Sequence, residues 1–451
     1  MFDPELILEH YQKPVPRYTS YPTAPQFKPN TGAEFFDAAI LDLPEDAPVS
    51  AYIHIPYCDR LCWFCGCHTK HTLKYAPVSR YVQSLIREIA LLDQRLAFRP
   101  RLGQLHLGGG SPSLLNGNDL KAIREALAKT FDIDNQTEIS VEIDPSDVND
   151  GSINRLVEFG LTRASIGVQD FHEDVQAAIN RPQSYEVTAD VVDQLRAAGV
   201  RSVNIDALYG LPLQTLPRLL KTIDQCISLQ PDRIALFGYA HVPWLKKHQK
   251  LICENDLAGP LDRYQHAQEA AILLRRSGYE SIGIDHFAMP KDSLAKASRN
   301  GRLRRNFQGY TTDHHETLLG MGASSIGRFA QGYVQNTVAT HQYQAEVTAG
   351  ILPKGKGLQL TDDDKLRGYL IERLMCDFAI DFDTLSGHPD HLVEVCVRQA
   401  RNAAAMDRFG LCTMNGSRFE IAPQAKAFTR IVAAIFDAYY QTEKFQYSKA
   451  V

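Results

Sequence analysis

Strand-like runs alternate with amphipathic helical stretches through the middle of the chain, and this rhythm constrains the fold more than any other feature. Strands are predicted at residues 50–55, 104–107, 138–143, 164–168, 202–205 and 233–237, with 281–284 as a candidate seventh. Helices are predicted at 77–97, 118–131, 152–159, after Leu216 and at 261–276. Repeated strand and helix pairs favour an α/β fold whose parallel sheet has right-handed crossovers and curls into a full or partial (β/α) barrel.

The alternation of strands and helices ends on both sides of this region, which predicts three consecutive domains. Residues 1–48 contain many Pro and Thr and are expected to form an extended N-terminal arm rather than a helix. Residues 49–349 form the barrel. Residues 350–451 are predicted to be a small α+β, winged-helix-like domain, with helices at 362–378, 391–408 and 423–440 and a hairpin at 411–421 that turns at Asn415-Gly416.

Composition and charge exclude several classes of protein. Of the 451 residues, 44% are hydrophobic and 22% are charged, which is ordinary for an ordered globular chain and excludes disorder. The net charge of -5 argues against nucleic-acid binding by the whole chain. No apolar run approaches the roughly 18 residues of a membrane span, and the acidic start is unlike a targeting peptide. We expect a cytoplasmic protein that binds no membrane.

Polar and glycine residues follow the predicted strands, at the end where reacting groups lie in parallel α/β barrels. They are Cys58 after the first strand, Gly108 to Gly110 after the second, Glu142 and Asp144 after the third, Gln169 and Asp170 after the fourth, Asp206 after the fifth, and Tyr239 to His241 after the sixth. We therefore expect groups from six strands to converge on one site.

Nine cysteines divide into two classes by spacing. Five stand far apart and are expected to be inert core thiols: Cys226, Cys253, Cys376, Cys396 and Cys412. The other four, Cys58, Cys62, Cys65 and Cys67, fall within ten residues, and an odd total in a long chain is not a disulfide framework. The compact group indicates a metal site.

The spacing Cys58-x3-Cys62-x2-Cys65 leaves more than one ligand set open. Three thiolates could hold a 4Fe-4S cluster whose fourth iron takes an exogenous ligand, or Cys67 could supply the fourth bond. The alternative is structural zinc, with His54 or His68 adding a nitrogen ligand. Zinc sites usually pair two knuckles that lie apart in sequence, and this chain lacks the second.

Motifs along nearly the whole chain resemble those of the oxygen-independent coproporphyrinogen III oxidase family of radical S-adenosylmethionine (SAM) enzymes. The cysteine loop follows YIHIPY at residues 52–57. The other motifs are RYTSYPTA at 17–24, GGGSPS at 108–113, EIDP at 142–145, GVQDF at 167–171, NR at 180–181, NIDALYGLP at 204–212, YAH at 239–241, RNFQGYTT at 305–312 and GMGASSIG at 320–327. The three-cysteine motif alone indicates only a radical SAM enzyme, whereas RYTSYPT, the Cys-Gly-Cys ending and NFQGYTT are more specific.

This resemblance implies a partial (β/α)6-type radical SAM barrel in which Cys58, Cys62 and Cys65 hold one 4Fe-4S cluster. The amino and carboxylate groups of one SAM then chelate the free iron, and Cys67 is not a ligand. It also implies two SAM molecules. The first is expected near Tyr52, Gly109 and Glu142. The second is expected against Phe64, Gly110, Ser111, Gln169, Arg181, Asp206, Ala240 and Ile326.

Each of these residues has a simpler explanation when taken singly. Gly108 to Gly110 could be only a strand-to-helix turn, and Glu142, Gln169 and Asp206 could be solvated loop ends. The sequence departs from the family at two positions, with Ser111 where Thr is common and Gly238 where Asn is expected. The first change keeps a hydroxyl, whereas the second puts the details of that strand end in doubt.

The resemblance implies a reaction in haem biosynthesis in which SAM-derived 5′-deoxyadenosyl radicals convert two propionates of coproporphyrinogen III to vinyl groups, giving protoporphyrinogen IX. Substrate carboxylates favour cationic contacts, which Arg302, Arg304 and Arg305 could supply beside Gln308 and Tyr310. The alternative for this segment is a basic, solvated surface. No catalytic side chain is assigned.

Two rival functions remain from the sequence. One is a haem-binding chaperone of the same superfamily without decarboxylase activity, against which Cys67 and NFQGYTT argue. The other is a zinc-organised interaction protein. For the oxidase we expect an electron donor and an electron acceptor of unspecified identity and a monomeric chain.

Overall fold

The computed structural model describes residues 2–11, 14–29 and 31–440 and divides the chain into two compact units. Unit 1 comprises residues 1–26, 207–312 and 360–451, and unit 2 comprises 27–206 and 313–359. These units do not coincide with the three consecutive domains predicted from sequence. Each unit instead combines stretches that lie far apart in the chain; in unit 2, for example, residues 318–321 return to pair with strand β2 near residue 50.

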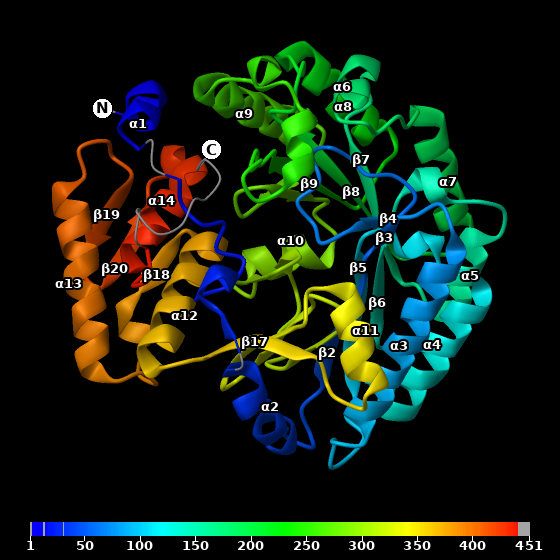
Figure 1. The fold of residues 1–451 in the computed structure, drawn as a ribbon. Helices are drawn as coiled ribbons and strands as arrows, with labels where there is room; N and C mark the ends of the chain where they lie inside the picture. Colours follow the sequence, from blue (N-terminus) through cyan, green and yellow to red (C-terminus); the bar gives the residue numbers. More distant parts are fainter. Residues whose placement is uncertain (1, 12–13, 30, 441–451) are drawn as a thin grey trace. The chain divides into compact units, whose positions relative to one another are not determined.

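Unit 2 is built on a sheet whose central strands are parallel (Figure 1). Within this unit the strand order is β1-β17-β16-β15-β14-β2-β5-β6-β7. The bounds are β1 (Lys28–Pro29), β2 (Val49–Ile55), β5 (Leu102–Gly109), β6 (Glu138–Ile143), β7 (Arg163–Gln169), β14 (Leu318–Met321), β15 (Ile326–Phe329), β16 (Gly332–Asn336) and β17 (Lys354–Gln359). Strands β14, β2, β5, β6 and β7 are parallel, and β14 to β17 pair antiparallel.

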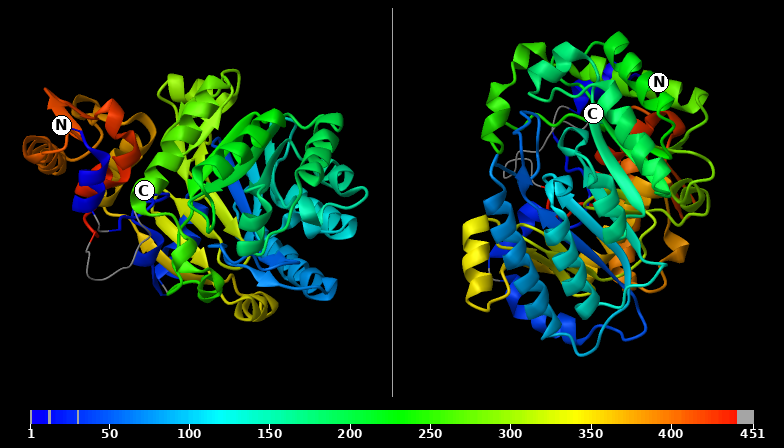
Figure 2. Two further views of the ribbon diagram at one scale, coloured as in Figure 1. Left: turned by 90° about the horizontal axis from the view of Figure 1, so that it is seen from above. Right: turned by 90° about the vertical axis from the view of Figure 1, so that its right-hand side faces the viewer.

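The helices of unit 2 are amphipathic and cover the parallel strands. Tyr81, Leu85, Ile89 and Leu92 of α3 (Tyr75–Asp93) are buried, as their spacing predicts. Helices α3, α4 (Gly117–Thr130) and α5 (Ser152–Phe159) lie side by side (Figures 1 and 2). The remaining helices of the unit are α2 (Thr31–Leu41), α6 (Glu173–Ala178), α7 (Tyr185–Ala197) and α11 (Thr340–Thr348). The predicted α/β class with a large parallel sheet is confirmed.

Strand β8 (Ser202–Tyr209) continues the series, with residues 202–206 in unit 2 and 207–209 in unit 1. Unit 1 then contributes β9 (Arg233–Gly238), which pairs antiparallel with β11 (His286–Ala288). A separate hairpin joins β12 (Arg304–Asn306) to β13 (Gly309–Thr311). The helices of this part are α8 (Leu216–Ser228), α9 (Pro260–Arg276) and α10 (Ser293–Arg299).

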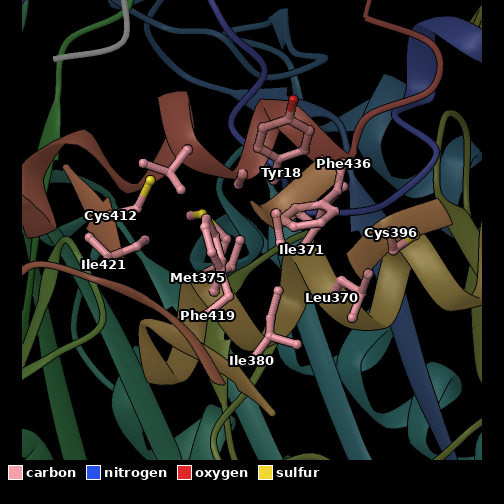
Figure 3. Packing of buried hydrophobic residues seen from close by; sticks show 14 of the residues in the cluster. Tyr18, Leu370, Ile371, Met375, Ile380, Cys396, Cys412, Phe419, Ile421 and Phe436 are labelled. Atoms are coloured by element: carbon pink, nitrogen blue, oxygen red, sulfur yellow. The ribbon is translucent and has the colours of Figure 1, made fainter. Parts of the chain in front are cut away.

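The C-terminal part of unit 1 packs helices against a small sheet of order β18-β20-β19. Its elements are α12 (Asp362–Asp377), β18 (Ala379–Asp381), α13 (Asp390–Met406), β19 (Cys412–Asn415), β20 (Arg418–Ile421) and α14 (Thr429–Ala433). Figure 3 shows Ile371 and Met375 of α12 packed with Phe419 and Phe436 in one apolar cluster. The predicted hairpin at Asn415-Gly416 is confirmed.

The prediction of a helix-free N-terminal arm is wrong. Residues Pro4–His10 form helix α1, and α2 follows at Thr31–Leu41. The Asp3 side chain caps α1 by accepting from the N–H groups of Glu5 and Leu6, and Pro4 occupies the first helical turn, where a missing N–H costs nothing. Between these helices, the described Pro-rich segment 14–23 is free of helix, as expected.

Two further predicted elements differ in the structure. The candidate seventh strand is β10 (Glu280–Ile282), which pairs antiparallel with β11 because the short connection between them cannot make a parallel crossover. The predicted helix at 423–440 is broken into 3₁₀ turns at Pro423–Phe428 and Ala434–Phe436 around α14. The Thr429 hydroxyl donates to the Lys426 carbonyl at 2.7 Å, so the side chain competes with regular helical bonding there.

None of the helices in the described ranges combines the length and apolar character that a membrane crossing requires.

Replacing Phe419 by Ala should lower the free energy of unfolding by about 3–5 kcal/mol, because this fully buried ring would leave a cavity. Denaturant titration followed by near-UV circular dichroism measures the change. Met406→Ala is the matched control, since Met406 is 77% exposed and should change stability by less than about 0.5 kcal/mol. Equal midpoints for the two variants would contradict this packing.

Candidate active site

The cysteine loop leaves the C-terminal end of β2 and is closed by a short parallel pair. Strand β3 (Tyr57–Cys58) pairs with β4 (Lys70–His71). The Lys70 N–H donates to the Pro56 carbonyl at 2.6 Å, and the Thr72 N–H donates to the Cys58 carbonyl at 2.9 Å. Residues 59–69 therefore form a loop with a fixed base at the edge where the strands of a parallel sheet present functional groups.

Residues 179–182, which follow α6, form hydrogen bonds to a second side of this loop. The Asn180 side chain donates to the Leu61 carbonyl at 2.9 Å, and the Trp63 N–H donates to the Ile179 carbonyl at 2.9 Å. Arg60 donates to the Pro182 carbonyl at 3.2 Å. Asn180 of the Asn-Arg motif therefore holds the loop in place, since it donates to a loop carbonyl that no strand pairing satisfies.

The thiols differ in exposure along the loop. Cys58, Cys62 and Cys65 are half-buried, Cys67 is exposed, and all four are free of disulfides. Burial raises the pKa of the Cys58 and Cys62 thiols, although Arg181 opposes the shift at Cys62 through a 3.5 Å hydrogen bond to its sulfur. Deprotonation of these thiols is therefore favoured by a bound metal, as is usual for thiolate ligands.

The loop supplies the donor set that an iron–sulfur cluster requires. Cys58, Cys62 and Cys65 are close enough to influence one another electrostatically. Three soft thiolates can hold a 4Fe-4S cluster and leave one iron open to another ligand. The residues therefore fit such a cluster.

A chain of polar side chains connects β2, β5 and β6 beside the loop. Tyr52 stacks on His106, with ring centroids 5.7 Å apart, and its hydroxyl lies 3.0 Å from Nδ1 of His54. Nε2 of His54 lies 2.9 Å from the His68 carbonyl, so Nε2 donates and Nδ1 can accept from Tyr52. This chain orients Tyr52 and ties β2 to the loop.

Glu142 ends the polar chain as an ionised carboxylate. Nε2 of His106 lies 3.2 Å from one of its oxygens, and the Gly109 N–H donates to the other at 2.8 Å. Burial alone would raise the pKa of Glu142, but the hydrogen bonds from His106 and Gly109 hold it below its ordinary value. The site thus presents a fixed negative charge.

The three glycines lie where other groups approach closely. A Cβ at Gly108 would lie 2.6 Å from Oε1 of Glu142, and one at Gly110 would lie 2.6 Å from the Tyr57 carbonyl oxygen. Gly109 has a φ of +108°, and a Cβ there would lie 2.3 Å from the His54 ring. These positions lie at the end of β5 and just after it, and they are more than a generic turn because each admits a neighbouring site group.

Arg181 joins three parts of the site. It donates to Asp144 at 2.8 Å and to the Gly167 carbonyl at 2.7 Å, and it contacts the Cys62 sulfur. Its Nε is buried and has no hydrogen-bond partner among the described residues. Burial opposes its charge, but Asp144 and Cys62 raise its pKa, so the guanidinium is charged with one donor still available.

Two other predicted residues of unit 2 are Ser111, just after β5, and Asp206, which was expected after its strand but lies within β8. Ser111 is buried and donates to Asp147, whose pKa is raised to about 8 by burial and by the nearby Asp144. Asp206 accepts from Ser165 at 2.9 Å and from Asn204 at 2.8 Å.

Gln169 ends β7 with a φ of +69°. Ile326 begins β15, where its backbone is packed against Gly320, the β14 partner of Tyr52. Phe64 lies within the loop between Cys62 and Cys65.

Ala240 and the predicted substrate residues belong to unit 1. The Ala240 carbonyl accepts from Gln249 at 3.2 Å. Arg304 donates to Glu372 at 2.9 Å, and Arg305 stacks over Tyr310 with its guanidinium carbon 4.4 Å from the ring centroid. The Tyr310 hydroxyl donates to the Met375 carbonyl at 2.6 Å. Gln308 is half-buried in the turn of this hairpin.

Sequence reasoning missed His106 and gave Asn180 no mechanical role. The alternation of side chains along β5 could have indicated His106, since His106 and Gly108 lie two residues apart and share one face of the strand. The contact between Asn180 and the Leu61 carbonyl has no such signal, because 119 positions separate the two residues.

Known proteins with similar sequences and structures indicate the family to which the chain belongs. Residues 52–225 match the model of the radical SAM superfamily. The chain is 46% identical over 436 residues to an oxygen-independent coproporphyrinogen III oxidase of Cereibacter sphaeroides, covering 97% of this chain and 96% of the relative. It is 36% identical over 434 residues to the Escherichia coli enzyme of the same name, covering 96% and 94%.

The chain belongs to the oxygen-independent coproporphyrinogen III oxidase family. The solved structure of the Escherichia coli coproporphyrinogen III oxidase (HemN), described as a radical SAM enzyme, superimposes with a TM-score of 0.90 at 35% identity, covering 97% of this chain and 100% of that one. Membership in this family implies a 4Fe-4S cluster and SAM as cofactors. The relatives carry the name of oxidases, which favours the enzyme over the chaperone alternative.

Replacing Cys58, Cys62 or Cys65 by Ser should each remove most of the bound iron and sulfide after anaerobic reconstitution, because three thiolates are the minimum set for this cluster. Iron analysis and visible absorbance measure the result.

Cys67→Ser should keep the cluster, since Cys67 is exposed. Cys253, which was expected in the core, is exposed and lies outside the loop, so Cys253→Ser is the matched control. Loss of iron in Cys67→Ser together with retention in Cys58→Ser would overturn the ligand assignment.

Proposed function

We propose that this chain catalyses the oxygen-independent oxidative decarboxylation of two propionate side chains of coproporphyrinogen III to vinyl groups, giving protoporphyrinogen IX. The observation that carries this proposal is the clamped loop of three thiols beside an ionised Glu142, in a chain similar to named oxidases over nearly its whole length. The reaction belongs to haem biosynthesis.

Cys58, Cys62 and Cys65 hold the cluster, and Cys67 does not. When bound, the cluster and SAM supply one-electron chemistry that generates a hydrogen-abstracting radical. The chain's own task is to position that chemistry and exclude water from it. The hydrogen bond that Asn180 donates to Leu61 and the one that the Ile179 carbonyl accepts from Trp63 keep the loop in one geometry.

Tyr52, Gly109 and Glu142 bind the first SAM. The ionised Glu142 can accept a hydrogen bond from an amino group or a ribose hydroxyl, and Gly109 lets a ligand approach the backbone. A second SAM is proposed against Phe64, Gly110, Ser111, Gln169, Arg181, Asp206, Ala240 and Ile326. The support for this second site is the buried, unbonded Nε of Arg181, which can donate to a carboxylate.

The substrate contacts the hairpin that contains Arg304, Arg305, Gln308 and Tyr310. Arg304 and Gln308 are half-buried and present donors to a ligand. Arg305 and Tyr310 are buried and stack on each other, so they form the wall behind these groups. We further propose that the enzyme acts as a cytoplasmic monomer with a separate electron donor and electron acceptor.

Anaerobic incubation with coproporphyrinogen III, SAM and dithionite should yield protoporphyrinogen IX, detected as protoporphyrin after oxidation. Cys58→Ser should reduce product formation at least a thousandfold, because no other described group replaces the cluster.

Cys253→Ser should retain full activity and serves as the control. Stable haem uptake without any product would refute the oxidase assignment and indicate the chaperone instead.

Glu142→Gln should weaken SAM binding by about tenfold to a hundredfold, because a hydrogen bond to a charged acceptor contributes about 1.5–3 kcal/mol. The pKa of Glu142 lies below its ordinary value, so this carboxylate stays ionised from pH 6 to 8 and adds no pH dependence there. Equilibrium dialysis at pH 6, 7 and 8 measures both effects. A wild-type affinity in Glu142→Gln would remove Glu142 from the SAM site.

A further inference from the structure

The segment that contains Arg17 is fastened to the end of the described chain. The Tyr18 hydroxyl donates to Asp437 at 3.0 Å, and the Ala438 N–H donates to the Tyr21 hydroxyl at 3.0 Å. The Tyr440 hydroxyl donates to the Pro14 carbonyl at 3.0 Å. Both Tyr18 and Tyr21 are buried, so the RYTSYPTA motif forms a rigid support for Arg17 within unit 1.

Arg17 itself remains exposed and makes one hydrogen bond within the described part of the chain. Its Nη2 donates to the Gly238 carbonyl at 2.8 Å. Desolvation lowers the pKa of Arg17, the positive charges of Arg263 and Arg305 lower it further, and Asp285 raises it. A guanidinium in such a position is accessible to a ligand and has several donors left.

The absence of a side chain at Gly238 lets a second arginine approach the same strand end. Arg263 donates to the Tyr239 carbonyl at 2.9 Å. A Cβ on Gly238 would lie 3.1 Å from Nη2 of Arg263 and 2.9 Å from the Tyr209 hydroxyl. Gly at this position, where Asn is expected, therefore leaves room for Arg263, and the Gly238 carbonyl accepts from Arg17 on the same strand end.

Two more arginines, Arg305 and Arg430, lie close enough to Arg17 and Asp285 to interact with them electrostatically. Arg305 lies 3.7 Å from Asp285, its side chain is 4% exposed, and its Nε and Nη1 have no hydrogen-bond partner among the described residues. Arg430 is half-buried, and burial together with the charge of Arg17 lowers the pKa of Arg430 to about 10. Gathering like charges that are partly desolvated is unfavourable unless an anion joins them.

We propose that Arg17 and Arg430 are substrate-binding residues that hold propionate carboxylates of the porphyrinogen, and that Arg263 and Arg305 are positioning residues behind them. This inference rests on the proposed function for the identity of the ligand. Arginine is suited to the task because its planar group can bind a carboxylate through two parallel hydrogen bonds. The substrate has four carboxylates, of which two are retained in the product, so part of the recognition can persist while the others react.

The test compares coproporphyrinogen III with its tetramethyl ester, which has the same ring and no negative charge. Binding is measured by anaerobic ultrafiltration without SAM, so that no turnover occurs. Arg17→Gln and Arg430→Gln should each weaken binding of the acid by about tenfold to a hundredfold and binding of the ester by less than about threefold. Arg17→Lys should lie between Arg17→Gln and the wild type, because it keeps the charge and loses the two-pronged geometry.

Arg418→Gln is the matched control, because Arg418 belongs to the same unit, is 54% exposed in its side chain and pairs with Glu420. It should leave both affinities unchanged. Wild-type affinity for the acid in both Arg17→Gln and Arg430→Gln would overturn the proposal. Equal losses for acid and ester would overturn it too, since they indicate a damaged fold rather than a lost charge contact.

Turnover separates this inference from the proposed function. In the anaerobic assay, Arg17→Gln should raise KM at least tenfold while kcat stays within about threefold, because Arg17 holds substrate and does not touch the reacting carbon. If the wild type binds the acid through Arg17 and Arg430 but forms no product, the carboxylate site stands and the reaction assignment fails. If both variants form product with an unchanged KM, the reaction assignment stands and the carboxylate site fails.

Discussion

Hydrogen bonds between the cysteine loop and residues 179–182 are the constraint on which the rest of unit 2 depends. The loop carries three half-buried thiols and has no sheet ladder of its own beyond its two-residue base. Its carbonyl at Leu61 and its N–H at Trp63 are satisfied by Asn180 and the Ile179 carbonyl instead. An irregular loop that must keep thiols at fixed separations needs such external partners, because every unsatisfied backbone group would favour rearrangement. The parallel sheet supplies the rigid frame from which both segments extend.

Close backbone approach determines what can be built next to that loop. Gly108, Gly109 and Gly110 leave space for Glu142, the His54 ring and the backbone at Tyr57. The result is a carboxylate that stays ionised although desolvation opposes its charge, since His106 and the Gly109 N–H both donate to it. In unit 1, Gly238 has a comparable role, because it admits Arg263 and exposes a carbonyl to Arg17. In each unit, the missing side chain of a glycine leaves space for a neighbouring charged side chain.

Periodicity predicted the parallel strands closely because those strands are buried and bounded by polar residues; β6 has the predicted bounds 138–143. The cysteine spacing indicated the loop that contains Cys58. The tendency of reacting groups to lie at the C-terminal ends of parallel strands indicated Glu142 and Gln169. Helix α1 was missed because Pro was taken as a breaker, although Pro4 lies in a first turn capped by Asp3. Contacts such as Asn180 with Leu61, or Arg17 with Gly238, join residues more than a hundred positions apart. No local pattern encodes them.

The fastening of residues 14–21 to residues 437–440 has a consequence for how the protein is made. All but one of the residues assigned to cluster and SAM binding in unit 2 precede residue 210, so that part of the chain leaves the ribosome early. Arg17 emerges earlier still, yet its support waits for Asp437, Ala438 and Tyr440. A growing chain can therefore acquire its cysteine loop well before it can order the arm. The appearance of residues 437–440 thereby becomes the event after which the RYTSYPTA segment, and the arginine it presents, take their final place.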